Sequence, residues 1–396
     1  MNDFNYYSPT RVVFGRSSVE KTGEAVAREG GKRALIVYGG GHAVKSGLIK
    51  RVEDSLESAG VAFVEFGGAR PNPLLSHAEK GVELAIEKGC DFILAVGGGS
   101  VIDTAKGIAH GAANQGTALW DIWKNPGSLK KSLPIGAVLT IAAAGSELSD
   151  SAVLTNEETS QKQGMNTDFN RCRFAIMNPE LLMSLPPYQL AAGITDIMMH
   201  TMERYFIPGI QCALTDEIAE GLLRTVIENG RKVIENPNDY DAMAEVMWSS
   251  SLSHNNLTEC GRGKDFSVHK LGMALSALYD DTHGATLSAV WGAWARYQYK
   301  EAIGRFARFA RKVFGVEEKD DERAALEGIE RAEEFWKSIG MPVDLNELCA
   351  DRGLPDEKAL IRLAELATRE RTMTLSRLRP LNVEECVEIY KMAIRP

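Results

Sequence analysis

The chain has 396 residues, of which 44% are hydrophobic and 25% charged, and its net charge is −9. This length exceeds one ordinary hydrophobic core, so we expect two domains. No apolar run reaches the roughly 20 residues that a membrane-spanning helix needs. The negative charge argues against a nucleic-acid partner, because a phosphate backbone requires a basic surface.

The cysteines and the N-terminus indicate the cellular compartment. The six cysteines include no CxxC pair, a pattern typical of reduced thiols. The opening MNDFNYYSPT has neither the positive start nor the apolar core of a signal peptide. These features predict a cytoplasmic protein with no membrane or nucleic-acid partner, either an enzyme or a small-molecule-binding protein.

The first half of the chain alternates strand-like and helix-like segments. Short apolar runs predict strands, and the amphipathic segments between them predict helices. The expected strands are 33–38, 61–66, 91–96, 134–140, 152–155 and 173–177, and the expected helices include 43–59 and 77–89. This spacing predicts βαβ units and one parallel sheet to which all these strands belong.

The second half is expected to be entirely helical. Strand signals end near residue 185, and helical periodicity follows. The expected helices are 187–206, 215–235, 238–254, 265–279, 284–314 and 320–339. We therefore predict an α/β domain at 1–184 and an all-helical domain at 185–396.

Two glycine-rich turns predict a dinucleotide site in the first half. In AVGGGSVIDTAK, Gly97, Gly98 and Gly99 directly follow a strand, and Ser100 is expected to cap the next helix. Residues without Cβ let a phosphate approach the backbone, and a helix start favours an anion. The other turn, YGGGHAVKSG at 38–47, comes first along the chain and lies in the first βα unit, where nucleotides bind in open α/β folds. Neither turn fits GxGxxG, and a tight turn without a ligand is the alternative.

A carboxylate and an imidazole share one face of the apolar segment GITDIMMHTMERYF. Asp196 and His200 lie four residues apart, and burying either without a partner would be costly. His269 and His283 would be about 21 Å apart in one unbroken helix, so the chain must turn back between them, at YDDTHG (279–284). An Asp/His₃ set of this kind suits iron(II), zinc or manganese. A set of hydrogen-bonded histidines without a metal is the alternative.

Four motifs together resemble the iron-dependent, or group III, alcohol dehydrogenase family. They are GGGSVIDTAK, LTIAAAGSE, LPPYQLAAGITDIMMHTMERYF and the H-x₁₃-HG pair. The resemblance runs nearly end to end and is closest to butanol dehydrogenases and NADPH-dependent aldehyde reductases, whose first βα turn also reads YGGG. It implies a Rossmann-like dinucleotide-binding domain followed by an all-helical metal-binding domain, an architecture that is similar to dehydroquinate synthase.

The resemblance also implies the activity and the site residues. The activity is the interconversion of an alcohol and an aldehyde or ketone by hydride transfer with NAD(P)H, in which a divalent metal, Fe²⁺ or Zn²⁺, polarises the substrate oxygen. The implied metal ligands are Asp196, His200, His269 and His283. The expected cofactor-binding residues are Gly39, Gly40, Gly41, His42, Lys45, Gly97, Gly98, Gly99, Ser100, Asp103, Thr140 and Lys162. A homodimer is also expected, paired through the N-terminal segment RVVFG.

Three residues depart from the family's pattern. The family usually has a histidine, credited with proton transfer, where Met273 stands, and a threonine where Ala144 stands. Close relatives often carry asparagine where this chain has Ser149. Met273 therefore implies another route for the proton, such as water or the cofactor ribose, and a more apolar pocket.

The first glycine-rich turn predicts a preference for NADPH over NADH. Gly39 stands where NAD-preferring relatives tend to carry aspartate, and Lys45, assisted by His42, could meet a 2′-phosphate. Two alternatives to this dehydrogenase stay open. One is another enzyme of the same scaffold, such as a glycerol-phosphate dehydrogenase or a dehydroquinate synthase-like lyase. The other is a catalytically weakened protein that binds nucleotide and metal.

Overall fold

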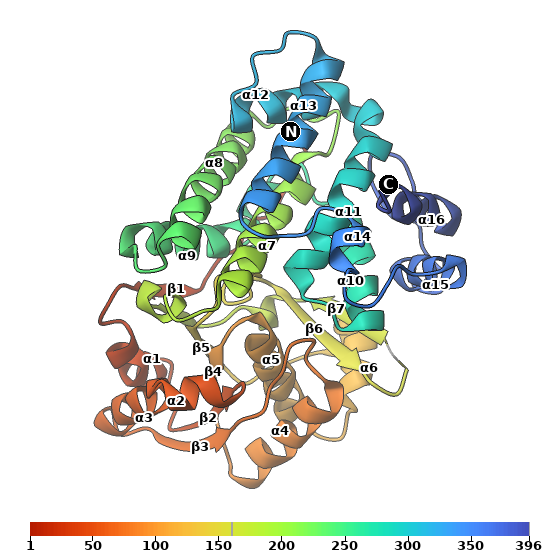
Figure 1. Ribbon diagram of the computed structural model, residues 1–396. Helices are drawn as coiled ribbons and strands as arrows, with labels where there is room; N and C mark the ends of the chain where they lie inside the picture. The colour runs from red at the N-terminus through yellow and green to blue at the C-terminus, as the bar shows by residue number, and fades with distance from the viewer. Residues whose placement is uncertain (160, 396) are drawn as a thin grey trace. The chain divides into compact units, whose positions relative to one another are not determined.

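The computed structural model describes residues 1–159 and 161–395, and the chain divides into two compact units. One unit is Tyr7–Leu185, and the other combines Met1–Tyr6 with Pro186–Pro396. The first unit is α/β and the second is mostly helical (Figure 1). The roles predicted for 1–184 and 185–396, in dinucleotide and metal binding, stay predictions.

The α/β unit contains the expected parallel sheet. Its strand order is β1-β8-β5-β4-β2-β3, and every neighbouring pair is parallel. The strands are β1 (Arg11–Phe14), β2 (Arg33–Tyr38), β3 (Ala62–Phe66), β4 (Phe92–Gly97), β5 (Ile135–Leu139) and β8 (Phe174–Met177). β2 and β4 are parallel neighbours, with Tyr38 opposite Val96. The two glycine-rich turns therefore lie side by side, at the carboxyl ends of these strands.

Helices cover both faces of this sheet (Figure 1). On one face, α1 (Thr22–Arg28) and α3 (Leu48–Ser58) bury alternate residues of the strands in a single apolar core. On the other face, α5 (Gly99–Ala113) packs on β2, β4 and β5, and α4 (Leu75–Glu87) packs on α5. The remaining α helices of this unit are α2 (Gly41–Lys45) and α6 (Leu119–Lys124).

The segment 152–155 was predicted in the parallel sheet, and that prediction is wrong. It lies in β6 (Ser151–Asn156), which pairs antiparallel with β7 (Gln161–Asn166) in a separate two-stranded sheet. Along β6, buried residues alternate with half-buried ones. This alternation is typical of an antiparallel strand with one wet face, whereas strands covered by helices on both faces are buried continuously.

The helix predicted at 43–59 is in fact two helices, α2 and α3. Gly47 separates them with φ 76°, a left-handed conformation that glycine adopts readily. The chain therefore leaves the first glycine-rich turn through a short helix and changes direction before α3 packs on the sheet.

The second unit is built around one buried helix, α7 (Pro187–Tyr205). Every residue of α7 from Leu190 to Tyr205 is buried. It packs mainly against α8 (Ala213–Glu235), α9 (Tyr240–Ser253) and α11 (His283–Gln298). The other helices are α10 (Ser267–Tyr279), α12 (Ile303–Phe314), α13 (Asp321–Ser338), α14 (Leu345–Leu348), α15 (Glu357–Ala367) and α16 (Val383–Met392).

The single helix predicted at 284–314 is interrupted. A 3₁₀ segment, Tyr299–Ala302, separates α11 from α12. The break redirects α12, so that its Phe306 ring stacks on Phe206, at the end of α7, with ring centroids 4.2 Å apart. Helical periodicity continues across the break, which is why the sequence did not predict it.

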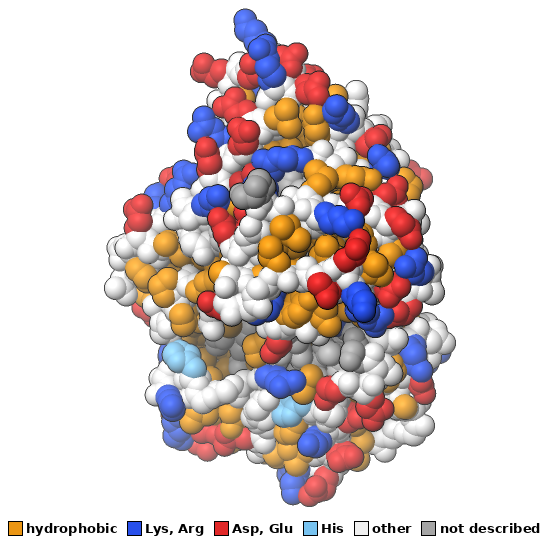
Figure 2. All heavy atoms as spheres, turned by 45° about the vertical axis from the view of Figure 1, so that its right-hand side comes forward, with side chains coloured by type: hydrophobic (Ala, Val, Ile, Leu, Met, Phe, Trp, Pro, Cys, Tyr) orange, Lys and Arg blue, Asp and Glu red, His pale blue; other side chains and the backbone are white. Residues whose placement is uncertain are grey.

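On the face shown in Figure 2, acidic and basic side chains are interspersed. Among the described residues, no helix combines the length and the hydropathy that crossing a membrane would require.

Candidate metal centre

The candidate metal centre begins on α7, where helix geometry places Asp196 and His200 one turn apart. Both side chains are about 4% exposed. His200 Nδ1 donates to the main-chain oxygen of Asp196 at 2.9 Å. A ring that donates through Nδ1 carries its lone pair on Nε2, which is the atom a metal needs.

The turn predicted at 279–284 is confirmed, and it brings His269 and His283 together. Asp280 ends α10 with φ 58°, and Thr282 precedes α11 in an extended conformation. The His269 and His283 rings then lie 5.3 Å apart between centroids. Gly284, next to His283, lets the start of α11 pack closely on α7, because a Cβ there would lie 2.1 Å from the main-chain oxygen of Ala192.

Three imidazoles converge on one carboxylate oxygen. Asp196 Oδ1 lies 3.2 Å from His200 Nδ1, 3.4 Å from His269 Nε2 and 3.8 Å from His283 Nε2. Asp196 Oδ1 and His269 Nε2 are buried and make no hydrogen bond among the described residues. Ligand atoms of Asp196, His200 and His269 all lie within 4.8 Å of one another. A divalent cation among these atoms would satisfy them, so the donor set fits the expected metal.

The electrostatics of the cluster also favour a cation. Burial lowers the pKa of His200 well below its usual range, and the neighbouring His254 and His269 add to this. Burial opposes protonation of His269 as well, but the carboxylates of Glu203 and Asp196 outweigh it and raise its pKa to about 9. The carboxylates around His269 therefore favour positive charge at this position.

Two residues of the centre were not predicted from the sequence. Glu203 follows His200 by three residues on α7, and its carboxylate contacts His269 Nδ1. The ring of His254, just after α9, lies 4.0 Å from the His200 ring between centroids. The i+3 spacing of Glu203 was a usable signal, because it extends the Asp196–His200 face by one turn. The position of His254 depends on tertiary packing alone.

The two glycine-rich turns have glycines for different reasons. At Gly97 a Cβ would lie 2.4 Å from a methyl of Val101, so packing alone requires glycine there. At Gly40 a Cβ would meet nothing within 4 Å, which leaves that backbone open to a ligand. Gly98, not Ser100, is the N-cap of α5, so the predicted cap is wrong: the helix begins two residues earlier than the sequence indicated.

The other residues predicted for the cofactor have protein partners. Asp103, whose side chain is 13% exposed, accepts from Ser146 Oγ at 2.6 Å and from the Val153 N–H at 2.9 Å, and desolvation raises its pKa. Lys162 Nζ donates to Asn72 Oδ1 at 2.8 Å. His42 Nε2 lies 3.1 Å from Ser184 Oγ, and the Thr140 N–H donates to the Gly97 carbonyl at 3.1 Å. Cofactor contacts of all these residues, and of Gly39, Gly41 and Lys45, stay predictions.

The three departures from the family's pattern lie in different surroundings. Met273 is half-buried on α10, four residues after His269 and so on the same helix face. Ala144 contacts the second glycine-rich turn, because a Cβ on Gly99 would lie 3.1 Å from it. Ser149 is fully buried, and its Oγ accepts the Ser151 N–H at 3.0 Å, which is a structural role.

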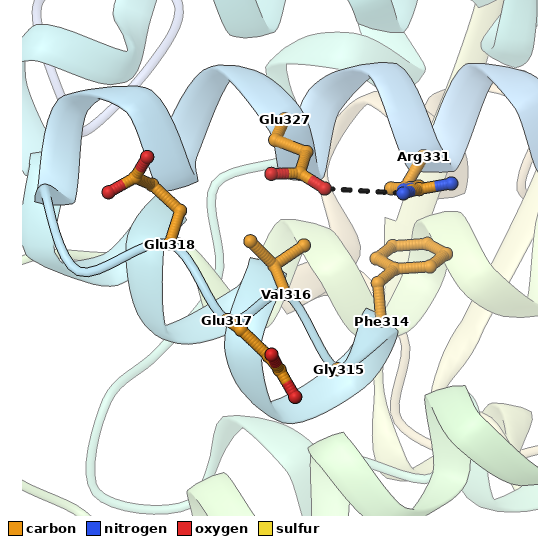
Figure 3. Close-up of a pocket in the computed structure, with 7 residues that line it drawn as sticks. All are labelled: Phe314, Gly315, Val316, Glu317, Glu318, Glu327 and Arg331. Atoms are coloured by element: carbon orange, nitrogen blue, oxygen red, sulfur yellow. Dashed lines mark hydrogen bonds and ion pairs between the residues drawn. The ribbon is translucent and has the colours of Figure 1, made fainter.

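A surface depression of about 430 Å³ lies elsewhere in the helical unit, between the end of α12 and α13 (Figure 3). Its acidic side chains are largely paired. Glu327 bonds Arg331 at 3.3 Å, and Glu318 lies 3.3 Å from Arg323. It contains none of the metal-centre residues, and we assign it no role in catalysis.

The close approach at Gly284 generates a prediction. We expect Gly284→Ala to push α11 away from α7, displacing His283, and to lower metal affinity at least tenfold together with a loss of stability. Isothermal titration with Co²⁺ and thermal unfolding measure both. Gly304→Ala on α12 is the control, because a Cβ there meets nothing within 4 Å. Equal metal affinities for the wild type and Gly284→Ala would contradict this account of the α7–α11 contact.

Comparisons with known proteins relate both parts of the chain to one family. Residues 9–179 match the family described as iron-containing alcohol dehydrogenase, and residues 190–394 match the C-terminal part of the Fe-containing alcohol dehydrogenase family. The chain is 38% identical over 394 residues to NADH-dependent butanol dehydrogenase A of Clostridium acetobutylicum, covering 99% of each. It is 34% identical over 354 residues to the NADPH-dependent aldehyde reductase YqhD of Escherichia coli, covering 89% of this chain and 90% of the reductase.

A solved structure extends the likeness to the whole fold. The crystal structure of an NADH-dependent butanol dehydrogenase A from Thermotoga maritima superposes with a TM-score of 0.94 at 36% identity, covering 100% of this chain and 99% of that one. The matches span both units of the chain. The chain therefore belongs to the iron-containing alcohol dehydrogenase family and is an alcohol dehydrogenase or aldehyde reductase.

Proposed function

We propose that this protein reduces small aldehydes with NADPH at a divalent metal held by Asp196, His200, His269 and His283. The observation that carries the proposal is that ligand atoms of Asp196, His200 and His269 lie within 4.8 Å of one another, with His283 Nε2 3.8 Å from Asp196 Oδ1. In the proposed reaction, the bound ion would act as a Lewis acid on the substrate oxygen, and the nicotinamide would carry the hydride. Fe²⁺ and Zn²⁺ both suit the donor set.

The chain's own residues would orient and tune this site. Asp196 supplies the one negative charge among the four ligands, which offsets part of the cation's charge and so moderates its acidity. Burial of Asp196, His200 and His269 keeps water from these ligands. His200 and His269 donate hydrogen bonds through Nδ1, which leaves the lone pairs of their Nε2 atoms for the metal.

A phosphorylated substrate, as in a glycerol-phosphate dehydrogenase, is less well supported. It would call for free basic groups near the metal, and Arg262 and Lys264 precede His269 in the sequence. In the structure, Arg262 Nη2 lies 2.5 Å from Asp216 Oδ1, and Lys264 Nζ lies 3.3 Å from a Glu259 oxygen. Both basic groups are therefore engaged in ion pairs within the protein. The names of similar proteins, butanol dehydrogenase and aldehyde reductase, support a small uncharged substrate.

We also propose a cytoplasmic homodimer. The six cysteines are free thiols, which a reducing compartment would preserve. Strand β1, which contains the segment RVVF, is at the edge of the parallel sheet, and Phe14 is 41% exposed. An edge strand offers unpaired N–H and C=O groups to a second chain, so this edge is where we place the dimer contact.

The metal requirement gives the main test. We expect the wild type to reduce aldehydes only when loaded with a divalent metal, and His269→Ala to lose metal and activity while staying folded, because the helical unit retains its core. Metal analysis after gel filtration, circular dichroism and steady-state rates over a panel of aldehydes measure this. His77→Ala, a histidine of the α/β unit, is the control. Metal bound as tightly by His269→Ala as by the wild type would disprove the ligand set.

The cofactor preference is a second prediction. Both NADH and NADPH occur in the names of similar proteins, so the preference must come from this chain's residues. At Gly39 a Cβ would lie 3.2 Å from the Ala69 carbonyl oxygen, so the end of β2 carries neither an acidic group nor easy room for one. We expect kcat/KM to be higher with NADPH than with NADH. Lys45→Ala should reduce the ratio of these two kcat/KM values about tenfold, because it removes a charged contact with the 2′-phosphate. The exposed Lys50 provides the control, Lys50→Ala. A preference for NADH in the wild type would refute this part of the proposal.

Met273 generates the third prediction. A thioether cannot carry a proton at neutral pH, whereas general acid–base help is typically worth about 10²–10⁴-fold. We expect Met273→His to raise kcat on small aldehydes and to introduce a pH dependence near neutrality. Met392→His, at an exposed methionine of α16, should change neither. If kcat and its pH profile are the same for Met273→His and the wild type, Met273 is a packing residue only.

A further inference from the structure

Glu203 holds both the ring and the backbone of one proposed metal ligand. It is 2% exposed on α7. Its Oε1 accepts the Val268 N–H at 2.6 Å and the His269 N–H at 3.2 Å. Its Oε2 lies 3.3 Å from the His269 nitrogen and contacts His269 Nδ1. One carboxylate from α7 thus binds the first turn of α10 and the imidazole that this turn carries.

The basic residue that follows Glu203 on α7 has partners of its own. The next residue, Arg204, directs Nε to Glu259 at 3.0 Å and Nη1 to the His200 carbonyl at 2.7 Å. The donors that the structure gives Glu203 are instead the N–H groups at the start of α10 and the His269 ring. A buried carboxylate requires such compensation, because removing it from water costs several kcal/mol.

The backbone at this point is strained, which indicates that the position of His269 is tightly determined. Phe266, directly before α10, has φ 64°, a conformation that bulky residues rarely adopt. Its ring lies 4.9 Å from the His269 ring and 5.9 Å from the His200 ring between centroids. Strain of this kind persists only where the surroundings impose it, and it gathers at functional sites.

We propose that Glu203 is a positioning residue for the metal, fixing the tautomer and the orientation of the His269 ring. A proton held on Nδ1 by Glu203 leaves the lone pair on Nε2, which faces Asp196 Oδ1 at 3.4 Å. The negative charge of Glu203 also makes that nitrogen a stronger donor. This inference rests on the proposed metal centre, and it assigns Glu203 no contact with substrate or cofactor.

The competing explanation is that Glu203 only caps α10. Glu203→Gln separates the two roles, since the amide oxygen can still accept the backbone N–H groups but supplies no charge to Nδ1. A matched control is Glu220→Gln on α8. Glu220 is likewise a buried carboxylate, and it binds the Tyr205 hydroxyl at 2.7 Å and Arg308 Nε at 2.5 Å, with no contact to a proposed ligand.

The experiment measures Co²⁺ binding by metal-free protein, by chelator competition and by the d–d absorption spectrum, with thermal unfolding as the test of folding. We expect Glu203→Gln to weaken Co²⁺ binding 10–100-fold and to shift the d–d bands, as changes to outer-shell partners of metal-bound histidines do. Glu220→Gln should keep the wild-type affinity and spectrum even if it unfolds at a lower temperature.

Two other results would contradict the positioning role or the proposed function. A folded Glu203→Gln with the wild-type affinity and spectrum would overturn the positioning role while leaving the metal centre intact. Absence of Co²⁺ binding by the wild type would instead overturn the proposed function itself. Should Glu203→Gln not fold, Glu203→Asp takes its place, because it keeps the charge but loses one methylene of reach. An affinity for Co²⁺ equal to that of the wild type would then overturn the proposal.

Discussion

The packing of the helical unit around α7 depends on the buried carboxylate of Asp196. A charge in the middle of an apolar helix is costly unless groups of opposite sign surround it. The burial of α7, the reversal between α10 and α11 and the glycine at 284 all bring imidazoles to that oxygen. The far end of α7 is held as well, since Arg262 and Arg305 donate to the Tyr205 carbonyl. Stability and chemistry therefore depend on the same helix.

The glycine-rich turns show that one residue type can serve two purposes. Gly97 has no room for a side chain, so a bare strand-to-helix turn would require glycine there even in a protein without a cofactor. Gly40 is under no such requirement and has an ordinary φ of −74°. The family relationship rests on the full set of motifs, and Gly40 is a position where packing does not explain the glycine.

Sequence reasoning succeeded where the signal is local and failed where partners come from elsewhere in the chain. Apolar runs identified β2, β3, β4, β5 and β8 of the parallel sheet, and the reversal near Asp280 followed from spacing alone. The sheet membership of β6 was wrong, because an apolar tetrapeptide does not reveal its partner strand. Four candidate ligands could be named in advance. The sequence also places Glu203 on the helix face of Asp196 and His200, but its contact with His269 and the position of His254 arise from packing of helices distant in sequence.

The grouping of Met1–Tyr6 with the helical unit affects how the protein can be divided. The Asn2 N–H donates to the Gly261 carbonyl at 2.9 Å, and a Cβ on Gly261 would lie 2.4 Å from the Met1 side chain. The first residues therefore pack on the loop that leads into α10. The helical unit is discontinuous in sequence, so a recombinant fragment starting at Pro186 would leave this loop uncovered. A circular permutant or a co-expressed N-terminal peptide is the way to isolate the unit intact.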